Sequence, residues 1–235
     1  MKKKSVRALA VIMCLMTAVA FMPAFAFATT DSGVTAKVKY AVSVAGSLQV
    51  QNKNITVKDT NGDGIVDVKE ALKQIHKANK KAITIKDGQI TKFWSKKTTV
   101  VSYYINDAMA WGVTDELKDG DYLYAFTFKD QASWTDVYAS IKNADGKRMV
   151  SIPLYKVIDL GTTVYTYDEN WNLVPDTNYD FSKITIKVNG KKQKGIDVFQ
   201  DGSFRIGFSK AGTYYISAVA SEGIITPPVF KVVVK

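Results

Sequence analysis

A run of twelve residues, DTNGDGIVDVKE at 59–70, constrains this chain more than any other feature. Oxygen-bearing side chains recur at alternate positions, and Gly64 stands sixth, where a sharp turn needs a residue without a side chain. A calcium ion takes about six to eight oxygen ligands, and a turning loop brings alternate side chains inward. The run therefore predicts a calcium-binding loop. Its ligands would be Asp59, Asn61, Asp63, the backbone carbonyl of Ile65, Asp67 and Glu70.

A plainer interpretation of the same run is an acidic turn before a helix. Asp67 would cap that helix and Glu70 would complete a capping box. This accounts for the last two ligand positions but leaves the earlier ones unexplained. A strand, not a helix, is expected before the loop, so we expect a calcium-stabilised clamp between strand and helix rather than a sensor that opens two helices.

The first 28 residues have the composition of an export signal. A basic start precedes an apolar run, and Ala26-Phe27-Ala28 then supplies the small residues at which signal peptides are cut. We expect a secreted protein that begins at Thr29 and has no transmembrane segment after cleavage. Association with the cell wall is compatible with this expectation. The single cysteine, Cys14, falls inside this signal, so the mature chain would have no disulfide.

Composition excludes several classes of function. The chain carries a net charge of +10, of which the signal contributes +4, and we expect a solvated basic surface and no nucleic-acid partner. His76, the one histidine, falls off the centre of a predicted apolar helix stripe, so we expect it at the surface or its boundary. The sequence has no nucleophile elbow, zinc-protease motif, P-loop or dinucleotide fingerprint. We expect no enzyme.

The first part of the chain alternates strands with one helix. Apolar residues at alternate positions predict a hairpin over 37–45 and 48–57, and apolar residues at helical spacing predict a helix over 68–79. Further strands are predicted over 82–85, 90–94, 100–105 and 122–128. This order is α+β, and it favours a β-grasp-like domain over 29–138, in which a mixed sheet folds over one helix.

The remainder, 139–235, is predicted to be all-β. It contains short alternating runs about ten residues apart, separated by turn signals such as Asn189-Gly190 and Asp201-Gly202. This pattern is typical of an immunoglobulin-like β-sandwich, here without a disulfide.

Aromatic residues raise a separate question of function. They alternate along the predicted strand 122–128 and therefore share one face of a sheet: Tyr122, Tyr124, Phe126 and Phe128. We expect this face to form the core against the helix stripe at Leu72 and Ile75, rather than an exposed stacking platform. The tryptophans expected in loops, Trp111 and Trp134, are the candidate ligand-binding residues.

Two segments resemble known families. The loop and helix, DTNGDGIVDVKEALKQ, resemble one calcium-binding half of a dockerin, which implies docking to a protein partner. The segment VSYYINDAMAWGVTDELKDGDYLYAFTFKD, at 101–130, is similar to the transcobalamin-like C-terminal domain of secreted and surface proteins of Gram-positive bacteria. The similarity rests on Tyr103-Tyr104, Asn106 and the turn Asp119-Gly120-Asp121 before an aromatic strand. In transcobalamin this domain covers one face of a corrinoid, so the resemblance implies ligand or surface binding.

Together these patterns predict an exported, non-catalytic, calcium-stabilised binding or adhesion module of the cell envelope. Its partner would be a cell-surface protein, a glycan or a small ligand. The alternatives are a soluble carrier of a corrinoid or glycan and a dockerin-like docking protein. Exposed tryptophans beside a pocket would favour a small ligand or sugar, whereas a flat strand edge or broad patch would favour a protein partner.

Overall fold

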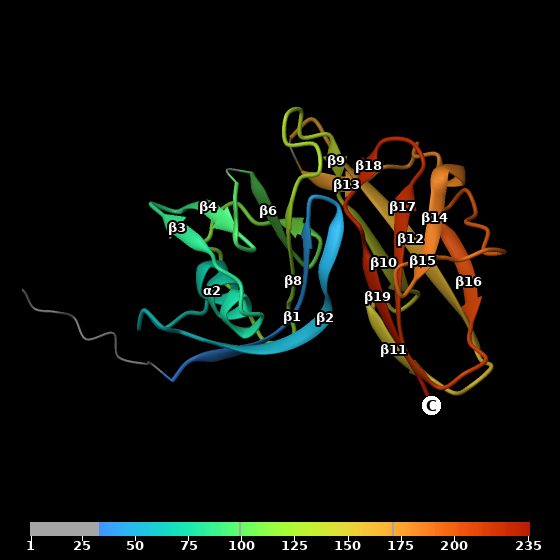
Figure 1. Cartoon of the computed structure of the whole chain (residues 1–235), viewed down its shortest axis with the longest axis horizontal. Helices are drawn as coiled ribbons and strands as arrows, with labels where there is room; N and C mark the ends of the chain where they lie inside the picture. Colours follow the sequence, from blue (N-terminus) through green and yellow to red (C-terminus); the bar gives the residue numbers. More distant parts are fainter. Residues whose placement is uncertain (1–32, 99, 171) are drawn as a thin grey trace, which may run out of the picture. The chain divides into compact units, whose positions relative to one another are not determined.

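The computed structural model describes residues 33–98, 100–170 and 172–235, which belong to one compact unit, 31–235 (Figure 1). The predicted export signal and Cys14 lie outside the described residues. The fold is mostly β, with two lobes that each have a hydrophobic core: the first lobe is 33–138 and the second lobe is 139–235. No helix in the described ranges is long and apolar enough to cross a membrane.

The first lobe is built on a mixed sheet. In spatial order its strands are β2 (Ser47–Lys58), β1 (Thr35–Val44), β8 (Tyr122–Thr127), β6 (Val101–Ile105) and β7 (Ala108–Met109). The central strands β1 and β8 run parallel, and the other neighbours are antiparallel. The turn between β1 and β2 has positive φ angles at Ala45 and Gly46, the conformation that joins two twisted strands most directly. The predicted hairpin is confirmed.

One helix, α2 (Val68–Ala78), packs on this sheet, close to the predicted bounds. Asp67 caps its N-terminus and Glu70 completes a capping box, so the first backbone N–H groups have partners. Leu72 and Ile75 are fully buried in the same core as the β1 side chains. A small sheet lies at the helix end and consists of β3 (Thr84–Lys86), β4 (Gln89–Phe93) and β5 (Lys96–Lys97).

His76 is a core residue, so the expectation of a surface or boundary histidine is wrong. Its exposed fraction is 0%, and its ring lies 4.7 Å from the Phe93 ring and 5.2 Å from the Trp94 ring. Nδ1 lies 2.7 Å from the Leu72 carbonyl oxygen, and the Trp94 backbone N–H donates to Nε2 at 3.2 Å. Helical periodicity places His76 off the main stripe, but the residues of β4 cover that side of the helix.

The second lobe is a sandwich of two sheets, as predicted for an immunoglobulin-like fold. One sheet contains β10 (Ala139–Asn143), β12 (Val157–Tyr167), β13 (Leu173–Pro175) and β16 (Ser203–Gly207). The other, in spatial order, contains β11 (Met149–Ile152), β19 (Val229–Val234), β17 (Gly212–Ala220), β14 (Ile184–Val188) and β15 (Lys191–Lys192). A 3-10 turn, η1 (Phe181–Lys183), precedes β14. Phe204 from one sheet and Phe230 from the other lie fully buried between them.

The aromatic face of β8 packs differently from the prediction. Leu123 and Ala125 face the core that contains the helix. Tyr124 and Phe126 face the opposite way and belong to a cluster with Tyr138, the last residue of the first lobe, and with Tyr165 and Val229 of the second lobe. The prediction that the aromatic face covers Leu72 and Ile75 is therefore wrong. The small aliphatic face lies under the helix, and the aromatic face is buried by the second lobe.

Candidate functional site

An aromatic cluster joins the two lobes. Tyr104 stacks on Tyr138 with ring centroids 4.1 Å apart and planes 13° apart, and it also stacks on Phe126 at 5.8 Å. The Tyr124 hydroxyl lies 3.0 Å from Ser43 Oγ and 2.9 Å from the carbonyl oxygen of Pro227 in the second lobe. Buried tyrosines need partners for their hydroxyl groups, and this interface supplies them.

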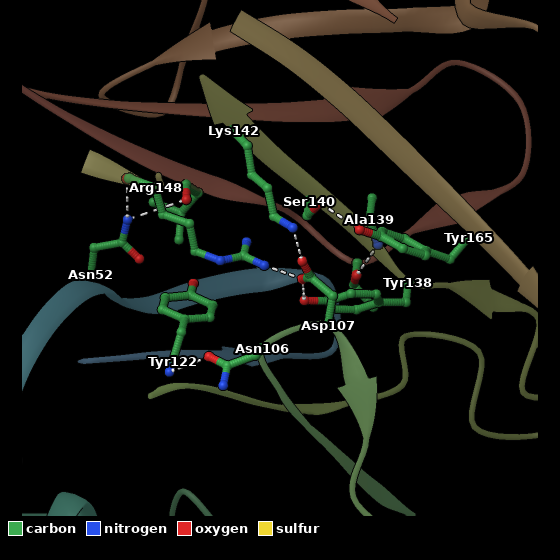
Figure 2. Close-up of polar contacts among 12 residues, drawn as sticks. Asn52, Asn106, Asp107, Tyr122, Tyr138, Ala139, Ser140, Lys142, Arg148 and Tyr165 are labelled. Carbon is green, nitrogen blue, oxygen red and sulfur yellow. Dashed lines mark hydrogen bonds and ion pairs between the residues drawn. The ribbon is translucent and has the colours of Figure 1, made fainter. Parts of the chain in front are cut away.

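A buried ion cluster lies beside the aromatic residues (Figure 2). Asp107, whose side chain is 8% exposed, pairs with Arg148 and Lys142 of the second lobe and accepts a hydrogen bond from the Tyr138 hydroxyl at 2.7 Å. Burial alone would raise the pKa of Asp107, but Arg148, Lys142 and the Tyr138 hydroxyl together hold it below its ordinary value. The Arg148 guanidinium also lies over the Tyr122 ring, 4.2 Å from its centroid.

An open cavity of about 880 Å³ lies along this aromatic cluster. Trp111 and Trp134, the two tryptophans predicted as ligand-binding, both line it and are 75% and 61% exposed. The other aromatic side chains around the cavity are Tyr104, Phe128, Tyr138, Tyr165 and Tyr167. The structure thus places two distant loop tryptophans at one site.

The loop that carries Trp134 is held by its own hydrogen bonds. Trp134 Nε1 donates to the Gln131 carbonyl at 3.0 Å. Asp130 accepts the Thr135 hydroxyl at 2.7 Å and the Ser133 N–H at 3.0 Å, and Asp136 accepts the Lys129 N–H at 2.7 Å. These bonds fix the indole before any ligand arrives, which lowers the entropic cost of binding.

The cavity combines ring faces with hydroxyl groups. The hydroxyls of Tyr104 and Tyr167 lie 3.0 Å apart, and burial raises the pKa of Tyr104, so this phenol stays protonated. Ser102, Ser133 and Thr135 add further hydroxyl side chains to the lining. Such a surface offers flat apolar contact together with donors and acceptors at its edge.

The predicted calcium loop forms a tight turn. Asp59 is fully buried and accepts the N–H groups of Gly62 at 2.7 Å and Gly64 at 2.8 Å, and Gly64 has a φ of +89°, which favours glycine. The Asn61 N–H donates to both Asp59 and Glu70 at 3.2 Å. The fold therefore brings the first and last predicted ligands together.

Of the remaining predicted ligands, Asn61 and Asp67 are hydrogen-bonded to Glu70, whereas Asp63 and Ile65 are exposed. Asp63 bonds to the Asn61 side chain, and Asp67 caps the helix. In the described ranges, no three acidic, histidine or cysteine side chains gather closely enough to hold a metal ion. A calcium ion would therefore need the Asn61 amide, the Ile65 carbonyl and a movement of Asp63 to complete its ligands.

Two carboxylates of this loop, those of Asp67 and Glu70, are buried. Asp67 and Glu70 are each 3% exposed, and neither forms an ion pair with another described residue. Burial raises the pKa of Asp67, although the Glu70 N–H partly opposes this. A divalent cation would offset the electrostatic cost of this arrangement, so the donor chemistry of the loop fits calcium.

The basic residues are less evenly spread than their total suggests. Between residues 69 and 97 the chain has nine lysines and two acids, a net charge of +7. None of these nine lysines forms an ion pair with a described residue. The net charge outside the predicted export signal is +6, so this segment, which covers the helix and the small β3–β5 sheet, accounts for all of it and the rest sums to −1.

No protein-family model matches the chain, and no curated protein matches it significantly. Among solved structures, fibronectin(III)-like modules of Clostridium thermocellum CbhA are 15% identical, with a TM-score of 0.28 over 65% of this chain and 82% of that one. Immunoglobulin domains 1–4 of Sidekick-1 are 8% identical, with a TM-score of 0.26 over 86% and 48%. Bacteroides ovatus SGBP-B, in complex with a mixed-linkage heptasaccharide, is 10% identical, with a TM-score of 0.20 over 58% and 60%. All three TM-scores are below 0.5, so the fold is argued here from strand order alone.

Proposed function

We propose that this chain is an exported, non-catalytic binding module whose aromatic cavity binds a carbohydrate. The observation that carries the proposal is the placement of Trp111 and Trp134, both exposed, on one preformed cavity. Sugar rings present C–H groups on their faces and hydroxyls at their edges. They match a site in which indole and phenol faces stand beside hydroxyl side chains.

The size of the cavity fits this class of ligand. Its volume of about 880 Å³ lies within the range of roughly 300–1,000 Å³ that small-molecule sites occupy. It has room for a short oligosaccharide or for part of a large planar ligand. One such planar ligand is a corrinoid, which the resemblance of 101–130 to the transcobalamin-like domain suggests. Carriage of a corrinoid is therefore the alternative function.

The proposed architecture is a β-grasp-like domain followed by an immunoglobulin-like sandwich. The order of the first sheet, with β1 parallel to β8 at its centre and α2 on one face, supports the β-grasp-like part. We further propose that the loop 59–70 binds calcium and stabilises the junction between β2 and α2. The fully buried Asp59 supports this, as do the buried carboxylates of Asp67 and Glu70, which form no ion pair with a described residue.

Glycan-array screening followed by titration calorimetry, with about 1 mM calcium present, tests the carbohydrate proposal. Loss of one stacking aromatic should weaken binding by roughly 2- to 12-fold, the equivalent of about 0.5–1.5 kcal/mol. We expect this for Trp111→Ala and for Trp134→Ala. Tyr155→Ala, which removes an exposed aromatic of the second lobe outside the cavity, is the matched control.

Two outcomes count against this proposal. The first is that the protein binds a corrinoid and no glycan, with that binding lost in the same tryptophan variants. This outcome would replace the carbohydrate proposal with the carrier alternative. Glycan binding that Tyr155→Ala weakens as much as Trp134→Ala places the ligand outside the cavity.

Calcium binding is tested by thermal unfolding with calcium or EDTA. A site with a Kd of roughly 0.1–1 mM gives about 0.4–1.4 kcal/mol of stabilisation at about 1 mM calcium. The control is Asp59→Asn, in which we expect the difference between calcium and EDTA to disappear. Equal melting temperatures for the unaltered protein in the two buffers would remove calcium from the proposal.

A further inference from the structure

We propose a second binding site, in a polar pocket of about 400 Å³ at the junction of the two lobes, that takes an acidic sugar residue. Its polar lining includes Lys39, Asn52 and Asn54 of the first lobe and Lys147 and Arg148 of the second, and no carboxylate side chain lines it. This pocket differs from the aromatic cavity, and the two linings share no residue. The inference does not depend on the carbohydrate proposal for that cavity.

Asn52 lines this pocket and carries a buried hydrogen-bond acceptor without a donor among the described residues. It lies at a bulge in the β1–β2 pairing and has a φ of +42°. Its Nδ2 donates to the carbonyls of Arg148 at 3.1 Å and Val229 at 3.2 Å, which fixes the orientation of the amide. Oδ1 points away from those carbonyls (Figure 2). A ligand hydroxyl that reached Oδ1, after a small shift of the side chains around it, would satisfy it.

Arg148 supplies positive charge and unused donors on the same wall. Its guanidinium carbon lies 4.2 Å from the centroid of the Tyr122 ring, and its side chain is 10% exposed. Within the described residues it donates to Asp107 alone, so it keeps further N–H groups that a ligand could use. Asp107 also pairs with Lys142, so this buried cluster of two cations and one anion keeps a net charge of +1. A ligand carboxylate in the pocket would neutralise this remaining positive charge.

Two lysines extend the positive charge to the rim. Lys39 forms no ion pair with a described residue, and Lys147 pairs only with the exposed Asp145 at 3.4 Å, a contact that water weakens strongly. Asp119 and Asp121, on either side of the lining residue Gly120, already accept the backbone N–H groups of Lys37 and Lys118. The pocket therefore offers cations to a ligand and has the amides of Asn52 and Asn54 in its wall, which matches a sugar that bears a carboxylate.

The pocket continues along the hairpin. An adjoining groove of about 500 Å³ shares Lys39, Asn54 and Gly120 with it. It adds Lys37, Thr56 and the carboxylate of Asp119, which accepts the Lys37 N–H at 2.6 Å. A chain of acidic sugars, rather than a single free one, would use both spaces. We therefore expect an oligomer of uronic acids to bind more tightly than the monomer.

The experiment compares trigalacturonic acid with the neutral galactose trimer by titration calorimetry on the full mature chain. Charge-assisted hydrogen bonds contribute about 1.5–3 kcal/mol, so we expect the acidic trimer to bind roughly 10- to 100-fold more tightly. The double variant Lys39→Gln with Lys147→Gln should lose a similar factor. Asn52→Gly, which keeps a residue suited to positive φ, should also weaken binding.

The matched control changes the same charge elsewhere. Lys96→Gln with Lys97→Gln removes two exposed lysines of the small sheet, and trigalacturonic acid should bind this variant as it binds the unaltered protein. Tyr155→Ala, which removes an exposed aromatic side chain outside both pockets, should likewise leave this binding unchanged. Absence of binding, equal binding of the neutral trimer, or equal loss in the Lys96/Lys97 variant would overturn the proposal.

Discussion

The two faces of strand β8 are packed in different ways. One face presents Leu123 and Ala125 to a mainly aliphatic core under helix α2. The other presents Tyr124 and Phe126 to the second lobe, where the Tyr124 hydroxyl reaches a carbonyl at Pro227 and Asp107 pairs with Arg148 and Lys142. The second lobe is thus part of the packing of the first, not a spacer that follows it.

The largest expected effect tests whether both faces belong to one folding unit. We expect Tyr124→Ala to lower the free energy of unfolding by about 4 kcal/mol and Leu123→Ala by about 3, because each opens a cavity in a closed core. Both variants should still unfold in one transition by calorimetry, since each face holds the same strand. Two separate transitions, with Leu123→Ala moving only one of them, would show that the lobes fold independently.

The next effect concerns the ion cluster on the aromatic face. Asp107→Asn leaves Arg148 and Lys142 without their anion, and breaking a buried pair costs about 3 kcal/mol or more. The matched control is Asp159→Asn, which breaks an exposed pair with Arg205 and should cost less than about 1 kcal/mol. Chemical unfolding measures both. Similar values for the two variants would mean that the Asp107 cluster contributes no more than a surface contact.

The pH dependence of this cluster follows from its lowered pKa. Because the folded-state pKa of Asp107 lies below the ordinary value near 3.8, its contribution is complete above that value and is lost as the pH falls through the folded pKa. In strong acid, therefore, the free energy of unfolding of Asp107→Asn should approach that of the unaltered protein.

A smaller effect probes the helix side of β8, where His76 is buried. Burial lowers the pKa of His76, and the hydrogen bond to Leu72 opposes this only in part. Below the ordinary pKa near 6.5, His76 binds a proton in the unfolded chain but stays neutral in the folded chain. Stability should then fall by at most about 1.4 kcal/mol per pH unit until the folded pKa is reached. His76→Gln, measured by thermal unfolding between about pH 7.5 and 5.5, should lack this loss. If stability falls with pH equally in His76→Gln and in the unaltered protein, the loss is due to other titrating groups.

The smallest effect isolates one hydroxyl of the aromatic face. Tyr124→Phe keeps the ring and removes only the contacts to Ser43 and Pro227, so we expect a loss of about 1 kcal/mol. Tyr155→Phe, at an exposed position, is the control and should be neutral. A neutral Tyr124→Phe would leave ring packing as the whole contribution of Tyr124 to the interface.

Part of the candidate site could be predicted from the sequence. Trp111 and Trp134 were identifiable because large aromatic residues in expected loops are seldom needed for a core, and the structure places both on one cavity. The cavity itself was not predictable, since its floor combines β6 residues such as Tyr104 with Tyr138 and Tyr165. The ion cluster was missed for the same reason: Asp107 and Arg148 are distant in the chain, and nothing in the local pattern of either marks a buried partner.

By itself, the sequence determined the local elements: the hairpin around Gly46, the capped helix over 68–78 and the short strands of the second lobe. Those follow from periodicity and turn chemistry, which act over a few residues. Only the tertiary structure decided which face of β8 meets the helix, why His76 is buried and where the two pockets lie. Alternation shows that a strand has two different faces, but which partner covers each face depends on contacts between residues far apart in the chain.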